Sequence, residues 1–243
     1  MLVRRHSWHS QSVPSFVLVH SPSVGPATWS PVADRLTAAG CETVLPSLLT
    51  VGENGPPFWP RVVAAVVGRL ADVQADQPLV LVAHSNAGVF LPVIRQGVRQ
   101  PVAFSVFADA TVPAAHGQTP MASAEFLPFL RDLAGPDGRL PQWTGWWNED
   151  DVAPMFPDQK VREVIAAEQP RLPLAYYEEL VPVPDGWDDH PCGYLQFSEA
   201  YDAPAEEARH RGWAVRSLPG EHLHQVVDPD ATARALLEFA DIS

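Results

Sequence analysis

The chain has 243 residues, of which 46% are hydrophobic and 19% charged, and a formal net charge of −13. This length fits one globular domain, or one domain with a large insertion. The acidic balance argues against nucleic acid or an anionic membrane surface as a partner, because both require a basic face. The two cysteines, Cys41 and Cys192, lie in apolar runs and do not indicate a disulfide framework. No segment resembles a signal peptide or reaches membrane-spanning length, so we expect a cytoplasmic protein.

Short apolar runs alternate with helical patterns along most of the chain. The runs that predict strands are residues 16–20, 42–45, 79–84, 103–108, 193–197 and 214–218. The helical patterns cover residues 29–39, 58–71, 86–99, 205–211 and 229–239. This alternation predicts an α/β fold with a mostly parallel sheet of about six strands and helices on both faces.

The alternation is interrupted between residues 111 and 191, where prolines and large aromatic residues are frequent. We expect this segment to form an inserted helical lid, while residues 1–110 and 192–243 form the core. A lid placed beyond the carboxyl ends of parallel strands covers the usual ligand-binding edge. Trp143, Trp146 and Trp147 are therefore candidates for the wall of a substrate pocket, although packing inside the lid explains them equally well.

Ser85 lies in the run VLVAHSNAG, residues 80–88. A buried strand followed by a serine between small residues and then an apolar helix is typical of a nucleophile elbow, usually written G-x-S-x-G. Here Ala83 and Ala87 occupy the glycine positions, and Gly88 follows. The pattern also fits a buried or capping serine, so it needs support from the rest of the chain.

A serine nucleophile requires a base, and the base requires a carboxylate that orients it. His222 lies in LPGEHLH, residues 218–224, after the last predicted strand. Asp109 ends the strand that follows the serine strand, and we prefer it as the acid. Asp202 and Glu199, which follow the strand at 193–197, remain the alternative acids. A metal pair of His222 and His224 lacks a third ligand at suitable spacing, so no metal site and no cofactor are expected.

The chain resembles the α/β-hydrolase fold superfamily, and in layout its compact branch of plant methyl-ester esterases and hydroxynitrile lyases. The resemblance rests on the strand at residues 16–20, HSNAG at 84–88, FADATVP at 107–113 and GEH at 220–222. In the superfamily the acid can follow either of two strands, and in this branch it usually follows the later one. The lyases carry a lysine directly after the catalytic histidine, where this chain has Leu223. The resemblance therefore disfavours a cyanohydrin lyase.

The same resemblance implies an oxyanion hole with one departure. The backbone N–H of Asn86 is the first expected donor. The second expected donor falls on Pro22, which has no N–H. Ser21 or Ser23 is the candidate replacement.

We therefore predict a serine hydrolase that acts on an ester, thioester or lactone of an apolar or aromatic small molecule, with Ser85, His222 and Asp109 as its triad. The alternative is an isomerase, cyclase or lyase of the same fold, with His222 as general base and Ser85 as a hydrogen-bonding group. A ligand receptor is a third class, which an intact serine and histidine pair disfavours. The sequence leaves the oligomeric state open.

Overall fold

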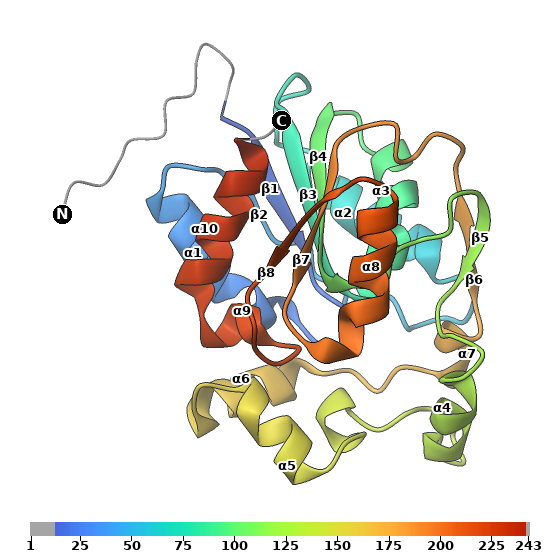
Figure 1. Ribbon diagram of the computed structural model, residues 1–243. Helices are drawn as coiled ribbons and strands as arrows, with labels where there is room; N and C mark the ends of the chain where they lie inside the picture. Colours follow the sequence, from blue (N-terminus) through green and yellow to red (C-terminus); the bar gives the residue numbers. More distant parts are fainter. Residues whose placement is uncertain (1–12, 242–243) are drawn as a thin grey trace.

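The computed structural model describes residues 13–241, so the N-terminal residues 1–11 considered for a signal peptide lie outside the described part. Its main sheet has the strand order β2-β1-β3-β4-β7-β8, and every neighbouring pair is parallel (Figure 1). The strands are β1 (Ser15–Val19), β2 (Thr43–Val44), β3 (Leu79–Ser85), β4 (Val102–Ala110), β7 (Cys192–Gln196) and β8 (Ala214–Ser217). The predicted parallel α/β sheet is confirmed.

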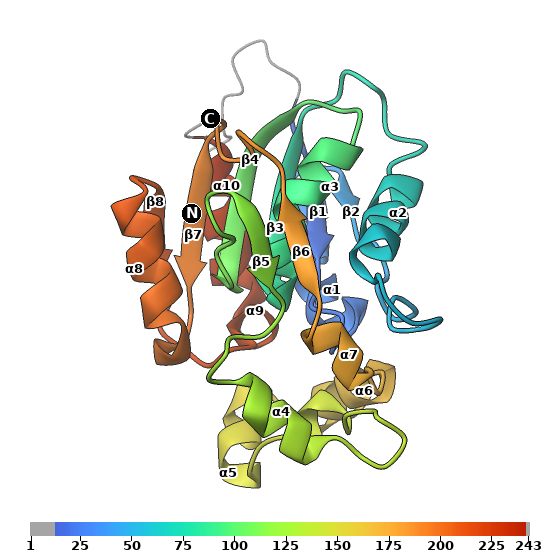
Figure 2. The same ribbon diagram turned by 90° about the vertical axis from the view of Figure 1, so that its right-hand side faces the viewer.

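The helices of the core cover both faces of this sheet (Figures 1 and 2). They are α1 (Ser30–Ala38), α2 (Trp59–Arg69), α3 (Leu91–Gly97), α8 (Asp202–His210), α9 (His224–Val227) and α10 (Pro229–Ala240). A 3-10 turn, η2 (Asn86–Phe90), precedes α3 and divides the helix predicted at residues 86–99. The predicted element boundaries otherwise differ from the observed ones by only a few residues.

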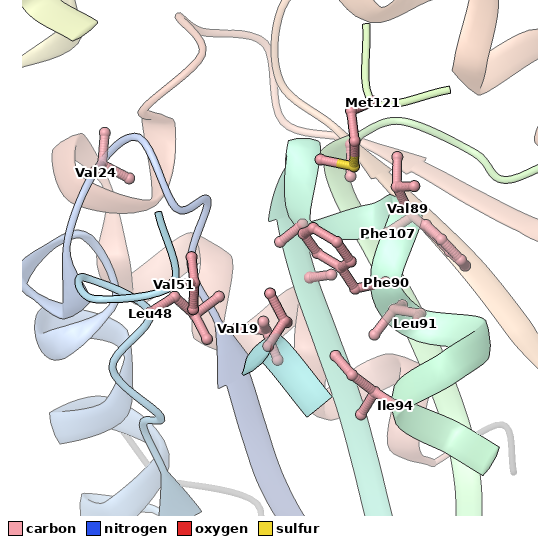
Figure 3. Packing of buried hydrophobic residues seen from close by; sticks show 14 of the residues in the cluster. Val19, Val24, Leu48, Val51, Val89, Phe90, Leu91, Ile94, Phe107 and Met121 are labelled. Atoms are coloured by element: carbon pink, nitrogen blue, oxygen red, sulfur yellow. The ribbon is translucent and has the colours of Figure 1, made fainter. Parts of the chain in front are cut away.

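Alternation along the strands divides the core into two clusters, because successive side chains of a strand point to opposite faces. Phe16 and Leu18 of β1 pack with α1 and α10, whereas Val17 and Val19 pack with α2, α3 and α8. All four side chains are at most 1% exposed. Figure 3 shows part of the second cluster around Val19. Burial on both faces explains why the strands are nearly continuous apolar runs.

Residues 111–191 contain short helices and a strand pair. The helical elements are α4 (Leu127–Leu133), η3 (Trp143–Gly145), α5 (Glu149–Val152), η4 (Ala153–Met155), α6 (Gln159–Glu168) and α7 (Leu174–Tyr177). The antiparallel pair β5 (Gly117–Pro120) and β6 (Leu180–Val183) joins the two ends of the segment. The expectation of a helical insertion was incomplete, because it omitted this strand pair.

Carboxylates of the inserted segment bind backbone groups of the core. Glu168 Oε2 accepts a hydrogen bond from the N–H of Ala27 at 2.9 Å. Glu179 accepts from the N–H groups of Phe58 at 2.7 Å and Trp59 at 3.2 Å, at the start of α2. N–H groups in a first helical turn lack intrahelical partners, so these bonds both satisfy the helix and fix the segment to the core.

Candidate functional site

Ser85 is the last residue of β3 and adopts φ 59° and ψ −133°, a conformation that L-residues rarely take. The chain can turn sharply into η2 here because small residues surround the serine. A Cβ atom on Gly88 would lie 2.2 Å from the carbonyl oxygen of Thr111 and 3.1 Å from the Cβ of Ala110. Gly88 thus supplies the close strand–helix contact that a glycine of the usual elbow pattern supplies.

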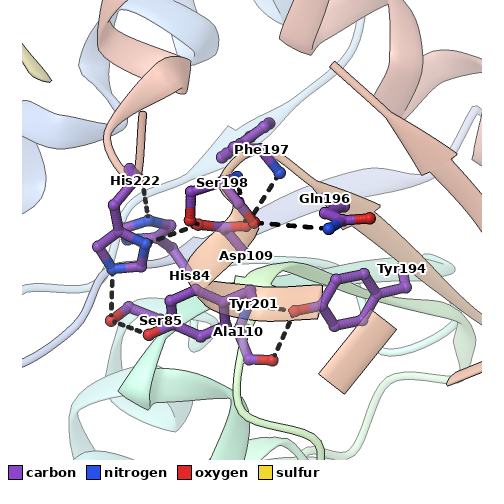
Figure 4. A network of polar contacts seen from close by, with 10 residues as sticks. All are labelled: His84, Ser85, Asp109, Ala110, Tyr194, Gln196, Phe197, Ser198, Tyr201 and His222. Atoms are coloured by element: carbon purple, nitrogen blue, oxygen red, sulfur yellow. Dashed lines mark hydrogen bonds and ion pairs between the residues drawn. The ribbon is translucent and has the colours of Figure 1, made fainter. Parts of the chain in front are cut away.

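His222 lies in the loop between β8 and α9 and contacts both predicted partners (Figure 4). Its Nε2 atom is 2.9 Å from Ser85 Oγ, and its Nδ1 atom is 2.7 Å from Asp109 Oδ2. The His84 ring packs beside it, with a centroid distance of 4.5 Å, and donates from Nε2 to the His222 carbonyl at 2.8 Å. Burial, followed by the nearby His222, lowers the pKa of His84 to about 3, so His84 is neutral at physiological pH.

Asp109 reaches His222 because β4 contains a bulge. The register passes from His84 opposite Ala108 to Ser85 opposite Ala110, so Asp109 is the extra residue. Its φ of 44° is in the left-handed region, and its side chain is fully buried. A bulge bends the strand and re-aims a side chain, and this one directs the carboxylate toward the loop that carries His222.

Hydrogen bonds compensate for the burial of the Asp109 carboxylate. It accepts from the N–H of Phe197 at 2.9 Å, from the N–H of Ser198 at 3.0 Å and from Ser198 Oγ at 2.7 Å. Burial raises the pKa of Asp109, but the bonds and charge of His222, with those of Ser198 and Phe197, outweigh it and lower the pKa overall. An ionised Asp109 accepts from His222 Nδ1–H, which leaves Nε2 free to accept the Ser85 proton.

The alternative acids lie elsewhere. Glu199 is exposed at the start of η5 (Glu199–Tyr201), and Asp202 is exposed at the start of α8. Asp202 accepts a hydrogen bond from Gln196 Nε2. The structure therefore brings Asp109, and neither Asp202 nor Glu199, into contact with His222.

A cavity of about 560 Å³ opens above Ser85 and His222. Six of its lining residues are aromatic: Phe126, Trp143, Trp146, Trp147, Tyr177 and Tyr201. Asn86, Met121 and Met155 also line it. All three predicted tryptophans are thus at the cavity. Trp147 additionally stacks on Phe126 and Phe129, with centroid distances of 6.2 and 5.5 Å.

A tight turn borders the cavity on the β1 side. Its backbone closes through the bond from Val24 N–H to the Ser21 carbonyl at 3.0 Å, with Pro22 and Ser23 between them. Ser23 lines the cavity, and its hydroxyl lies 2.8 Å from Ser21 Oγ. Buried His20 fixes the turn, because its Nδ1 donates to the Ser21 carbonyl at 2.8 Å while its Nε2 accepts from Leu48 N–H at 3.0 Å. Of Ser21, Pro22 and Ser23, the residue that reaches the cavity is Ser23.

Asn86 is held by its side chain. Its Oδ1 atom accepts from the Tyr176 hydroxyl at 2.6 Å, and its Nδ2 donates to the Met121 carbonyl at 2.8 Å. Both partners come from the inserted segment, so residues 111–191 contribute to fixing the elbow.

The sequence does not single out Tyr201, although it contacts two residues of the site. Its hydroxyl lies 3.3 Å from Ser85 Oγ, and its ring is parallel to the His222 ring, with a centroid distance of 4.7 Å. The sequence feature that could have identified Tyr201 is its position next to Asp202, shortly after the carboxyl end of β7. Within residues 13–241 no group of three His, Cys, Asp or Glu side chains could hold a metal ion, and no helix is long and apolar enough to cross a membrane.

Several solved structures resemble this one. An extracellular alpha/beta-hydrolase from a Paenibacillus species is 17% identical with a TM-score of 0.74, over 93% of this chain and 98% of that one. A pyrethroid hydrolase from Sphingobium faniae is 19% identical with a TM-score of 0.68, over 95% and 98%. A methylesterase from Arabidopsis is 16% identical with a TM-score of 0.67, over 95% and 100%. At these identities the likeness concerns the fold.

No curated protein matches the chain significantly. Residues 16–235, in contrast, match the sequence profile of the alpha/beta hydrolase family. This match covers both parts of the core and the segment inserted between them. The chain therefore belongs to the alpha/beta hydrolase family.

Proposed function

We propose that this protein is a serine hydrolase that cleaves an ester, thioester or lactone of an apolar small molecule. The observation that carries the proposal is the continuous chain of contacts from Ser85 Oγ to His222 and from His222 to buried Asp109, at the floor of an aromatic cavity. Family membership supports hydrolase chemistry in general. The residue roles and the substrate class are our inference.

In acylation, Ser85 Oγ attacks the acyl carbon while His222 Nε2 takes its proton. Asp109 stabilises the resulting imidazolium and holds its orientation. The tetrahedral intermediate then collapses, and His222 passes the proton to the leaving group. In deacylation, water repeats the sequence on the acyl-enzyme, with His222 again as base and then acid.

The oxyanion formed in each step requires donors beside Ser85. The backbone N–H of Asn86 begins η2 and has no partner within that short helix. Pro22 supplies no N–H, and we assign the second position to Ser23, through its hydroxyl or its N–H. The bond between Ser21 and Ser23, together with the His20 contacts, supports this assignment because it fixes the turn before substrate binds.

The cavity lining supports an uncharged, largely apolar substrate. The described lining residues include one carboxyl side chain, Asp151, and one histidine, His222, but no lysine or arginine. A substrate carboxylate or phosphate would have no cation to pair with and would lie in the field of Asp151. Flat aromatic walls favour planar or ring-containing groups.

A second candidate function uses the same residues without an acyl-enzyme. His222 would act as a general base and Ser85 as a hydrogen-bonding group in an isomerisation, cyclisation or elimination. The observation that favours it is Pro22, since a weakened oxyanion hole disfavours ester hydrolysis.

A fluorophosphonate probe separates the two. We expect it to label the wild-type protein at Ser85, and Ser85→Ala to abolish the labelling. We also expect turnover of neutral aromatic esters. Labelling without turnover across an ester panel would favour the second function, and a folded wild-type protein that forms no adduct would refute acyl-enzyme chemistry.

A further inference from the structure

Tyr201 approaches the Ser85 hydroxyl from the loop that follows β7. Its hydroxyl is 3.3 Å from Ser85 Oγ, and its ring stacks on His222 with an interplanar angle of 3° (Figure 4). The neighbouring residues Phe197 and Ser198 bind Asp109 through their backbone N–H groups. The acid that orients His222 therefore also anchors the loop that positions Tyr201.

The direction of the Tyr201 hydrogen bond follows from which of the neighbouring groups carry a proton. Ionised Asp109 accepts from His222 Nδ1–H, so Nε2 is an acceptor and takes the single hydroxyl proton of Ser85. Ser85 Oγ can then only accept from Tyr201. Burial raises the pKa of Tyr201 well above its usual value despite the bond to Ser85, so the phenol keeps its proton at neutral pH.

At 3.3 Å this contact is long for a bond between two hydroxyl groups, and so it is weak in the resting enzyme. Hydrogen bonds shorten and strengthen when the acceptor gains negative charge. Ser85 Oγ gains such charge when it leaves the acyl group. A contact that strengthens only at that stage lowers the barrier without stabilising the ground state.

We propose that Tyr201 is a catalytic residue that donates a hydrogen bond to Ser85 Oγ while this oxygen is expelled in deacylation. The proposal rests on the serine hydrolase function proposed above. Water adds to the acyl carbon as His222 Nε2 takes one of its protons. The bond from the acyl carbon to Oγ then breaks, its electron pair goes to Oγ, and the His222 imidazolium returns the proton to Oγ. Tyr201 stays protonated throughout.

The role predicts unequal effects on the two half-reactions. An activated ester or fluorophosphonate is attacked through an early transition state, in which Ser85 Oγ has gained little negative charge, so removing the donor changes this step little. Removing the donor to the leaving oxygen slows deacylation. A merely structural role of Tyr201 would instead change both half-reactions together through a displaced His222.

Tyr201→Phe keeps the ring on His222 and removes only the donor. With a p-nitrophenyl ester, we expect the acyl-enzyme to decay roughly 10-fold to 100-fold more slowly than in the wild type. Rapid quenching and intact mass would follow the acyl-enzyme. The fluorophosphonate labelling rate of Ser85 should change much less in the variant than the rate of acyl-enzyme decay. Tyr201→Leu, which also removes the stacked ring, should slow labelling as well.

The proposed role of Tyr201 would be overturned if the acyl-enzyme of Tyr201→Phe decayed at the wild-type rate, or if this variant accumulated no acyl-enzyme. It would also be overturned if fluorophosphonate labelling and acyl-enzyme decay slowed by the same factor in this variant. Failure of the wild-type protein to react with the fluorophosphonate would instead refute the hydrolase function. The two failures are therefore distinguishable.

Discussion

The hydroxyl of Tyr194 in β7 binds both backbone polar groups of Ala110, the residue that follows the bulged Asp109. It accepts from the Ala110 N–H at 3.1 Å and donates to the Ala110 carbonyl at 3.0 Å. A bulge interrupts the hydrogen bonds of a ladder, and buried backbone groups left unpaired are costly. One side chain thus satisfies the backbone beside the strained residue that orients His222 (Figure 4).

Tyr194→Phe should destabilise the fold by roughly 1–3 kcal/mol, because it leaves the buried N–H and carbonyl of Ala110 without this partner. Urea denaturation followed by tryptophan fluorescence measures the change. Turnover should fall as well, since the bulge is less well fixed. A variant with wild-type stability would contradict this account of the bulge.

The residue that orients His222 can be identified by replacing each candidate carboxylate with the amide of the same size. Asp109→Asn should lower kcat by about 10⁴-fold, because an amide that donates to His222 selects the wrong imidazole tautomer. Asp202→Asn and Glu199→Gln alter exposed side chains and should change kcat less than about 3-fold. Circular dichroism would show that each variant is folded. A larger loss in Asp202→Asn than in Asp109→Asn would transfer the role to Asp202.

Gly88→Ala tests the packing of the elbow. The added methyl group would overlap the Thr111 carbonyl, and we expect a loss of roughly 1–3 kcal/mol in stability together with loss of fluorophosphonate labelling. Gly68→Ala is the matched control, because Gly68 is an exposed residue of helix α2 and an added Cβ would meet nothing within 4 Å. This control should gain up to about 1 kcal/mol through higher helix propensity. Equal effects of the two substitutions would contradict the packing argument.

Acidification should destabilise the protein below about pH 6.5. Burial lowers the pKa of His20 to about 4 and that of His84 to about 3, against 6.5 for the unfolded chain. Well above pH 6.5 these histidines are neutral in both the folded and the unfolded state, so they make no pH-dependent contribution to stability there. As the pH falls, the unfolded state binds protons first, so stability decreases until the folded pKa values are reached. The loss between pH 6.5 and 5 is roughly 2 kcal/mol for each histidine.

Urea unfolding at pH 7.5, 6.0 and 5.0 measures this dependence. His20→Gln should unfold more easily at pH 7.5 and show a shallower dependence on pH. A free energy of unfolding that stays constant between pH 7.5 and 5.0 would show that these histidines titrate normally in the folded state.

The cavity should discriminate between neutral and anionic substrates. Of two aryl esters of equal size, one neutral and one with a terminal carboxylate on the acyl chain, the neutral ester should have the higher kcat/KM. The lining has Asp151 and no lysine or arginine among its described residues, so the anion gains no pairing. At low ionic strength, Asp151→Lys should reduce the difference in kcat/KM between the two esters, mainly by lowering KM for the anionic ester. Preference of the wild type for the anionic ester would refute this substrate class.

The amino-acid sequence alone determined the order of strands and helices, because strands buried on both faces need continuous apolar runs and helices need a 3.6-residue period. It also placed Ser85 and His222 at loops after strands, where parallel strands present their carboxyl ends at one edge. The sequence favoured Asp109 but left Asp202 and Glu199 as alternatives, since all three follow strands of the same sheet.

Tertiary structure decided the contact of Asp109 with His222 through a one-residue shift in the pairing of β3 with β4, which no local pattern encodes. It likewise decided that Ser23 rather than Pro22 meets the cavity and that Tyr201 reaches Ser85. The β5–β6 pair joins segments about 60 residues apart, and its four-residue strands, GQTP and LVPV, each contain a proline and are too short to show a periodic pattern. Local sequence fixes which elements form, whereas register and long-range contacts fix where their side chains point.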